Sequence, residues 1–168
     1  DNVYFGEGFR PKLLQAAKRK EGATVFGYTV KDPQRFDVTE FDENHVAISI
    51  EEKPDVSKSN YAVTGLYFVD ATAPERAKSI KPSARGELEI TALLETYLRD
   101  GNMRVEKLGR GYAWLDTGTQ AALLDASNFV RTLTERQGLQ VGSPDEVAYQ
   151  RKWISKEQIT VTSEKFGK

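Results

Sequence analysis

The stretch from Ile48 to Pro54 combines residue types that could hold a phosphate group at the end of a strand. Ile48 and Ile50 alternate with polar residues, which is the pattern of a strand with one buried face. Pro54 lacks the N–H group that a central strand needs, so Lys53 is expected at the strand end. Open α/β sheets bind ligands at strand ends, which makes Lys53 a candidate phosphate clamp. A solvent-exposed surface lysine is the alternative, and it is the commoner setting for a charged residue.

Other charged residues are expected at strand ends or in loops around the same sheet. Asp1 and Asp116 supply two carboxylates, and Glu52 directly precedes Lys53. Arg85 lies in a loop that contains proline and glycine. Mg²⁺ commonly binds one or two carboxylates and completes its shell with phosphate oxygens and water, while arginine and lysine bind phosphate directly. Together these side chains would form a metal-plus-phosphate site, but their spacing alone does not bring them together.

The composition describes one ordinary domain, or a large piece of a longer protein. The chain has 168 residues, of which 39% are hydrophobic and 29% are charged, and its formal net charge is −1. A charge this close to zero gives no general attraction to nucleic acid or to anionic membranes, so neither is expected as a partner. The absence of cysteine excludes disulfides and thiolate metal sites. No apolar run approaches the roughly 20 residues of a membrane helix, and a cytoplasmic protein is expected.

Strand and helix patterns alternate along the chain, but a hairpin interrupts the alternation. β-Branched and aromatic residues predict strands over 23–30, 61–69, 103–108 and 112–115, and a hairpin over 38–41 and 46–51. Apolar spacing and caps predict helices over 11–20, 73–80, 87–100 and 119–138, and another that opens at Ser143-Pro144. The hairpin favours a mixed α/β sheet over a purely doubly wound one. Residues 1–154 are expected to form one domain and residues 155–168 a polar tail.

Several runs of the sequence resemble the glucose-1-phosphate thymidylyltransferases, which belong to the sugar nucleotidyltransferases. The matching runs are 51–54, 58–67, 81–91 and 109–119, continued at 128–129 and 135–139. The resemblance extends in register from Asp1 to about Trp153. It implies a mixed, mostly parallel Rossmann-like sheet and a homotetrameric assembly.

The resemblance also implies a reaction and a set of site residues. dTTP and α-glucose 1-phosphate would give dTDP-glucose and pyrophosphate, a step in nucleotide-sugar biosynthesis of the dTDP-rhamnose type. Asp1 and Asp116 match the two aspartates that hold the catalytic Mg²⁺. Lys53 and Arg85 match the residues that grip the sugar phosphate. The protein would then act mainly by positioning and by electrostatic stabilisation.

Four further positions match residues that surround the sugar in this family. Glu52 matches a residue that binds the glucose by its carboxylate, and Val63 matches one that binds it by its backbone. Tyr67 and Trp114 match residues that form walls near the sugar.

The sequence departs from the family pattern in two places. The glycine-rich nucleotide loop, of the form G-G-x-G-T-R-L, is absent and belongs before Asp1 in the family. The chain is therefore expected to be a fragment that lacks the nucleotide-binding segment and has little or no activity alone. The second departure is Asp37, which stands where the family has a glycine whose backbone approaches the sugar. Asp37 either turns outward or adds bulk and negative charge beside an anionic substrate.

Two alternatives to the thymidylyltransferase activity remain open at this stage. One is a sugar-phosphate nucleotidyltransferase that uses UTP, because the base-reading segment is not in the sequence. The other is a catalytically silent sugar-phosphate-binding or regulatory subunit. Asp37 and the absent loop favour this second alternative. The presence of Asp1, Lys53, Arg85 and Asp116 favours the enzyme, because a silent subunit has no need for both metal carboxylates.

Overall fold

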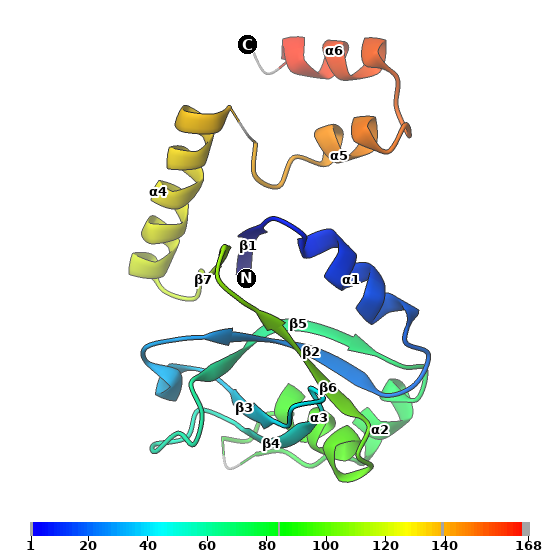
Figure 1. Ribbon diagram of the computed structural model, residues 1–168, viewed down its shortest axis with the longest axis vertical. Helices are drawn as coiled ribbons and strands as arrows, with labels where there is room; N and C mark the ends of the chain where they lie inside the picture. The colour runs from blue at the N-terminus through cyan, green and yellow to red at the C-terminus, as the bar shows by residue number, and fades with distance from the viewer. Residues whose placement is uncertain (1, 84, 139, 166–168) are drawn as a thin grey trace. The chain divides into compact units, whose positions relative to one another are not determined.

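The computed structural model describes residues 2–83, 85–138 and 140–165 (Figure 1). The chain divides into two compact units, Asp1–Gly118 and Thr119–Lys168, which are described separately. The predicted boundary near residue 155 stays a prediction.

The first unit is built on a five-stranded mixed sheet with the strand order β4-β3-β5-β2-β6. The strands are β2 (Ala23–Thr29), β3 (Val38–Phe41), β4 (Ala47–Glu51), β5 (Tyr61–Val69) and β6 (Met103–Leu108). β2 and β6 are parallel, whereas the pairs β2–β5, β3–β5 and β3–β4 are antiparallel. A mixed α/β fold is therefore confirmed.

The expectation of a mostly parallel sheet is wrong for the described residues. A short turn joins β3 to β4, and the Asp42 Oδ1 atom accepts hydrogen bonds from the N–H groups of Asn44 and Val46 there. A connection this short can join only antiparallel strands, because parallel neighbours need a crossover of a dozen or more residues. No helix connects β4 to β5, so the parallel crossover that a helix would provide is also missing there.

Helices cover both faces of this sheet in Figure 1. On one face lie α2 (Ala73–Ser79) and α3 (Ile90–Arg99), and the fully buried Leu94 and Tyr97 of α3 pack in the same cluster as Val25 and Val105. On the other face lies α1 (Phe9–Lys18), whose Ala16 packs with residues of β2 and β6. The alternation of side chains along β2 supplies both faces, because Val25 and Phe26 point in opposite directions.

Two smaller elements complete the first unit. β1 (Asn2–Gly6) and β7 (Tyr112–Asp116) form an antiparallel two-stranded sheet, in which Asn2 pairs with Asp116. The short 3-10 helix η1 (Pro33–Arg35) leads from β2 toward β3. These elements place Trp114 and Asp116 beside the segment that precedes β3.

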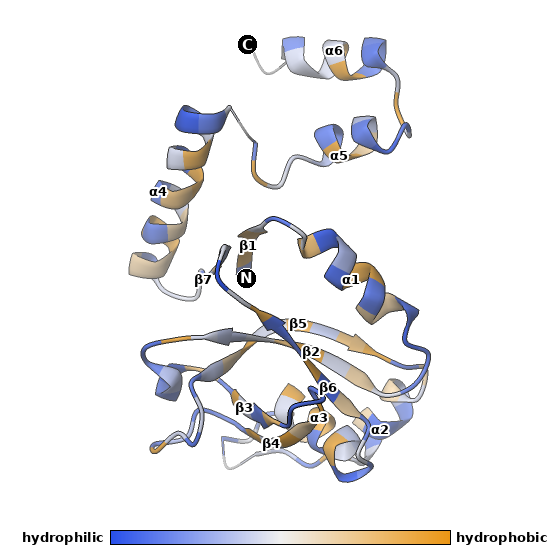
Figure 2. Ribbon diagram, in the orientation of Figure 1, coloured by the Kyte–Doolittle hydropathy of each residue, from blue (hydrophilic) through white to orange (hydrophobic). Residues whose placement is uncertain are grey.

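The second unit contains α4 (Gln120–Gln137), α5 (Pro144–Gln150) and α6 (Lys156–Lys165). The sequence offers Thr117 or Thr119 as the cap of α4, and the structure shows Thr119, whose hydroxyl accepts a hydrogen bond from the Ala122 N–H group at 3.1 Å. Figure 2 shows hydrophobic residues along one side of α4, and Leu123 and Leu124 there are exposed. The polar stretch after Ser155 contains α6. Within the described residues, no helix is both long and apolar enough to cross a membrane.

Candidate functional site

Glu52 and Lys53 lie directly after β4, at the strand end that the sequence predicts. Lys53 is exposed and has a φ angle of 38°, which is uncommon for a residue with a side chain. Pro54 follows and prevents the strand from continuing. The backbone thus turns at Lys53, directly after the edge strand β4.

Arg85 brings a loop distant in the sequence to this strand end. Its Nη2 atom lies 3.3 Å from Glu52 Oε1 and 3.0 Å from carboxylate oxygens of both Glu87 and Glu89. The Ser83 hydroxyl orders the loop, because it donates to Glu89 at 3.0 Å and accepts from the Arg85 N–H group at 3.2 Å. Glu52 and Arg85 are therefore in contact in the structure, as expected for residues of one site.

Asp37 lies near enough to this group for the charges of Lys53, Glu89 and Arg85 to act on its carboxyl group. Its carbonyl oxygen accepts a hydrogen bond from the Val63 N–H group at 2.7 Å, and its carboxylate accepts one from the Thr91 hydroxyl at 2.9 Å. The carboxyl group is turned inward toward α3, which contradicts the outward orientation. Burial raises the pKa of Asp37, and the negative charge of Glu89 adds to this, whereas the Thr91 hydrogen bond and the Lys53 charge lower it.

The charges of the site act on one another across these contacts. Burial raises the pKa of Glu52, and repulsion from Glu89 raises it further, while attraction to Arg85 opposes both effects. Burial likewise raises the pKa of Tyr67 to about 12, with a smaller contribution from the negative charge of Asp37. The Tyr67 phenol therefore stays protonated at neutral pH and can donate a hydrogen bond.

Val63 and Tyr67 lie on β5, on either side of an irregularity in the strand. The register between β2 and β5 shifts near Gly65, whose φ angle is 73°. A Cβ atom at position 65 would lie 2.9 Å from the Asn2 side-chain nitrogen, so only glycine fits both the backbone and the space. The neighbour that approaches Gly65 is thus the side chain of Asn2, on β1.

Trp114 forms a wall of aromatic rings next to the Asp37 segment. The centroid of its ring lies 5.0 Å from the ring centroid of Phe36 and 6.0 Å from that of Tyr28, and both pairs are edge-on. Its indole N–H group donates to Asn2 Oδ1 at 2.8 Å. Since Phe36 directly precedes Asp37, the aromatic wall and the charged cluster are continuous along the backbone.

Asp116 is half-buried at the end of β7. Its charge contributes to a raised pKa of Arg35, after the larger effect of the ion pair between Arg35 and Asp32. The second predicted metal ligand, Asp1, lies outside the described residues. Among the residues that are described, no group of three His, Cys, Asp or Glu side chains could hold a metal ion.

Phe36, Glu89 and Thr91 are among the residues of this region that have no assigned role in the sequence prediction. Glu89 and Thr91 lie within the run 81–91 that carries the resemblance. The sequence therefore shows which residues they are, but it does not show which side chains they contact in the fold. Thr91 lies in the first turn of α3, and its contact with Asp37 spans 54 residues of sequence. Contacts of that separation depend on the packing of α3 against the sheet and are not encoded by local spacing.

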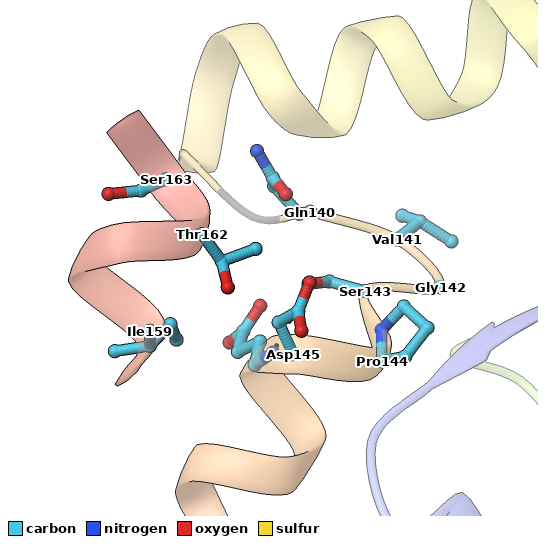
Figure 3. Close-up of a pocket in the computed structure, with 10 residues that line it drawn as sticks. Gln140, Val141, Gly142, Ser143, Pro144, Asp145, Ile159, Thr162 and Ser163 are labelled. Carbon is cyan, nitrogen blue, oxygen red and sulfur yellow. Dashed lines mark hydrogen bonds between the residues drawn. The ribbon is translucent and has the colours of Figure 1, made fainter. Parts of the chain in front are cut away.

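A separate cavity of about 690 Å³ lies within the second unit (Figure 3). Its walls are the segment before α5, the start of α5 and one side of α6, from which Ile159, Thr162 and Ser163 face it. Ser143 is already engaged, because its hydroxyl caps α5 by accepting from the Glu146 N–H group. None of the site residues predicted from the sequence lines this cavity.

Comparisons with known proteins agree with the motifs. A family model described as nucleotidyl transferase matches residues 1–132. The chain is 55% identical to a glucose-1-phosphate thymidylyltransferase from Neisseria gonorrhoeae over 159 residues, which cover 95% of this chain and 55% of that protein. It is 50% identical to the protein of the same name from Mycobacterium tuberculosis (strain H37Rv), again over 95% of this chain and 55% of the relative.

A solved structure shows the same likeness. A crystal structure of a protein from Bacillus anthracis, named as a glucose-1-phosphate thymidylyltransferase and in complex with a sucrose, superposes with a TM-score of 0.67 and 40% identity. The match covers 78% of this chain and 52% of that one. The chain spans about half the length of the curated relatives it matches. The resemblance inferred from the motifs is confirmed, and the chain belongs to the nucleotidyl transferase family.

Proposed function

We propose that this chain contributes the sugar-phosphate site of a glucose-1-phosphate thymidylyltransferase. The enzyme would join dTTP and glucose 1-phosphate into dTDP-glucose and pyrophosphate. One observation carries the proposal: Arg85 lies 3.3 Å from Glu52, next to Lys53, although the two segments are about thirty positions apart in the sequence. All three match residues of the family's sugar-phosphate site.

Lys53 and Arg85 bind the phosphate in this proposal. The Lys53 ammonium is an exposed point charge at a strand end, and the Arg85 guanidinium offers several N–H donors in a planar fork. Only Nη2 of Arg85 is shared between the three carboxylates, so its other donors can engage a phosphate without breaking those contacts. Glu87 is the most exposed of the three, at 66%, and is the carboxylate that a phosphate would displace most readily.

The remaining residues orient the sugar. The Glu52 carboxylate accepts hydrogen bonds from sugar hydroxyl groups, and the protonated Tyr67 can donate one. The N–H group of Val63 is already donated to Asp37, so its carbonyl oxygen must make any backbone contact with the sugar. Trp114 and Phe36 provide an apolar wall.

Enzymes of the nucleotidyl transferase family generally use a divalent metal ion, and we propose Mg²⁺. Asp116 supplies one carboxylate at the end of β7, and Asp1 is the proposed second ligand. One or two carboxylates suit an Mg²⁺ ion that takes its other ligands from phosphate oxygens and water. When bound, such an ion neutralises charge that develops on the α-phosphate.

The proposed reaction is the one that the family resemblance implies. An oxygen of the sugar phosphate attacks the α-phosphorus of dTTP, and the bond to the pyrophosphate oxygen breaks. This chain's residues fix the attacking phosphate by Lys53 and Arg85 and the sugar by Glu52, which lowers the entropic cost of the encounter. The family resemblance further implies a homo-oligomer that acts in the cytoplasm.

The test is turnover by the full-length enzyme with dTTP, glucose 1-phosphate and Mg²⁺, measured as pyrophosphate release. Arg85→Ala and Lys53→Ala are each expected to lower kcat/KM about 100-fold, because each removes a charge-assisted contact to the phosphate. Lys20→Ala, which removes an exposed lysine after α1, is the control and should stay within twofold of the wild type. Wild-type activity in both site variants would contradict the proposal.

The silent-subunit alternative is tested by the same protein. It predicts that glucose 1-phosphate binds without any release of pyrophosphate. The negative charge of Asp37 inside the site is the observation that favours this alternative.

A further inference from the structure

The proposed function gives no role to the carboxyl group of Asp37, which lies in the site. It is half-buried, and side chains from every neighbouring element face it. Those side chains are Thr91 on α3, Lys53 and Glu52 after β4, Arg85 and Glu89 from the loop before α3, and Tyr67 on β5.

The charges around Asp37 are unbalanced. Lys53 and Arg85 attract its carboxylate, and Arg85 already contacts three other carboxylates. Two cations thus face a larger number of anions in this part of the first unit. A phosphate group that binds to Lys53 and Arg85 adds at least one more negative charge to a site that is short of positive charge.

We propose that Asp37 sets how tightly this site binds the phosphate group of a sugar phosphate, because its carboxylate competes with that phosphate for the positive charge of Lys53 and Arg85. The inference rests on the proposed function. Asp37 acts through its neighbours and is a positioning residue, since the Thr91 hydroxyl holds its carboxylate on the inner side of the site. Removing the charge while keeping the shape therefore strengthens the binding of the anion.

The protonation of Asp37 makes this effect dependent on pH. Burial raises the pKa of the carboxyl group, so it becomes neutral at a higher pH than an exposed aspartate. Competition with the phosphate is full when Asp37 is ionised and is lost as the pH falls through its raised pKa. The Thr91 hydroxyl stabilises the ionised form, so removing that hydroxyl shifts the loss to higher pH.

The experiment measures the Kd of glucose 1-phosphate by calorimetry, with the full-length enzyme at several pH values between 5 and 8. The variants are Asp37→Asn and Thr91→Val, and the control is Asp55→Asn, an exposed aspartate two positions after Lys53. Each variant is compared with the wild type at the same pH, because the phosphate of the probe itself titrates near pH 6. Circular dichroism verifies that each variant is folded.

Asp37→Asn is expected to lower the Kd about 5- to 20-fold at pH 8, which is the effect of a nearby like charge at the dielectric of a protein surface. The ratio should shrink as the pH falls toward the raised pKa of Asp37, and Thr91→Val should move that change to higher pH. Binding of glucose, which has no phosphate, should change less than twofold.

Three results would overturn the inference: a Kd unchanged or raised by Asp37→Asn, an equal gain in Asp55→Asn, or a ratio that does not change with pH. If neither the wild type nor any variant binds glucose 1-phosphate, the proposed function fails and the inference fails with it. If the wild type binds and only the Asp37 effect is missing, the proposed function stands without the inference.

Discussion

Two aspartates of the first unit, Asp37 and Asp70, show how differently the same side chain can be used. Asp70 directly follows β5, and its carboxylate accepts hydrogen bonds from the N–H groups of Gly22 and Thr72 and from the hydroxyls of Thr72 and Tyr97. These bonds hold the pKa of Asp70 well below its usual range. Asp37 receives one such bond, and burial raises its pKa.

The difference separates a structural carboxylate from one that faces a ligand. Asp70 joins the end of β5 to the start of α2 and to the buried Tyr97 of α3, so its ionised form is part of the packing. Asp37 lies among exposed cations at the strand end that carries Lys53. A carboxylate that is stabilised by the fold contributes to stability, whereas one that the fold disfavours when ionised is available to respond to a substrate.

The largest effect on stability is expected from Asp70→Ala. Four donors lose their acceptor, and the Tyr97 hydroxyl becomes a buried group without this partner. The free energy of unfolding should fall by about 2–4 kcal/mol, measured by urea denaturation. Asp37→Ala is the matched variant and should change it by less than about 1 kcal/mol, because Asp37 accepts only one side-chain bond. Equal losses in the two variants would remove the distinction between these residues.

The pH dependence of stability should also differ between the two residues. The folded pKa of Asp70 is depressed, so its contribution is complete above its unfolded pKa of about 3.9 and is lost as the pH falls below that value. Asp37 has the opposite sign, because its folded pKa is raised and stability falls as the pH rises through it. Urea unfolding between pH 3 and 7 should therefore show a weaker acid loss in Asp70→Asn than in the wild type. A steeper acid loss in that variant would contradict the assignment.

A smaller effect is expected from Tyr97→Phe. This variant keeps the buried ring of α3 and removes only the hydroxyl that donates to Asp70 at 3.0 Å. The loss should be about 1 kcal/mol, and Tyr97→Phe in an Asp70→Asn background should cost less, since the two residues share that bond. Fully additive losses in this double-mutant cycle would show that the bond contributes little.

The local features of the site could be predicted from the sequence. The break at Pro54 predicted the end of β4, and the apolar spacing after Glu87 indicated α3. The expectation that Ile48 and Ile50 share one buried face is wrong for Ile48, which is 63% exposed, because the β3–β4 pairing is irregular next to it and Ala47 is buried instead. Such patterns repeat over a few residues, so a single strand or helix is enough to produce them. The family resemblance then identified the residues that matter on those elements.

The tertiary contacts of the site could not be predicted from the sequence. The inward turn of Asp37 depends on Thr91, and the three carboxylates around Arg85 come from two separate segments. The sheet of the described residues is mainly antiparallel, since a tight turn follows β3 and no helix separates β4 from β5. The β3–β4 hairpin was visible in the local sequence, whereas the contacts of Asp37 and Arg85 have no signature within a short window of sequence.

The central claim is that Glu52, Lys53 and Arg85 form one sugar-phosphate site. The most direct measurement is an NMR titration of the ¹⁵N-labelled protein with glucose 1-phosphate, in the wild type, Lys53→Ala and the control Lys20→Ala. We expect saturable shifts that centre on residues 37, 52–53, 63 and 85–91, which disappear in Lys53→Ala and persist in Lys20→Ala. Shifts that lie elsewhere, or that survive unchanged in Lys53→Ala, would contradict the claim.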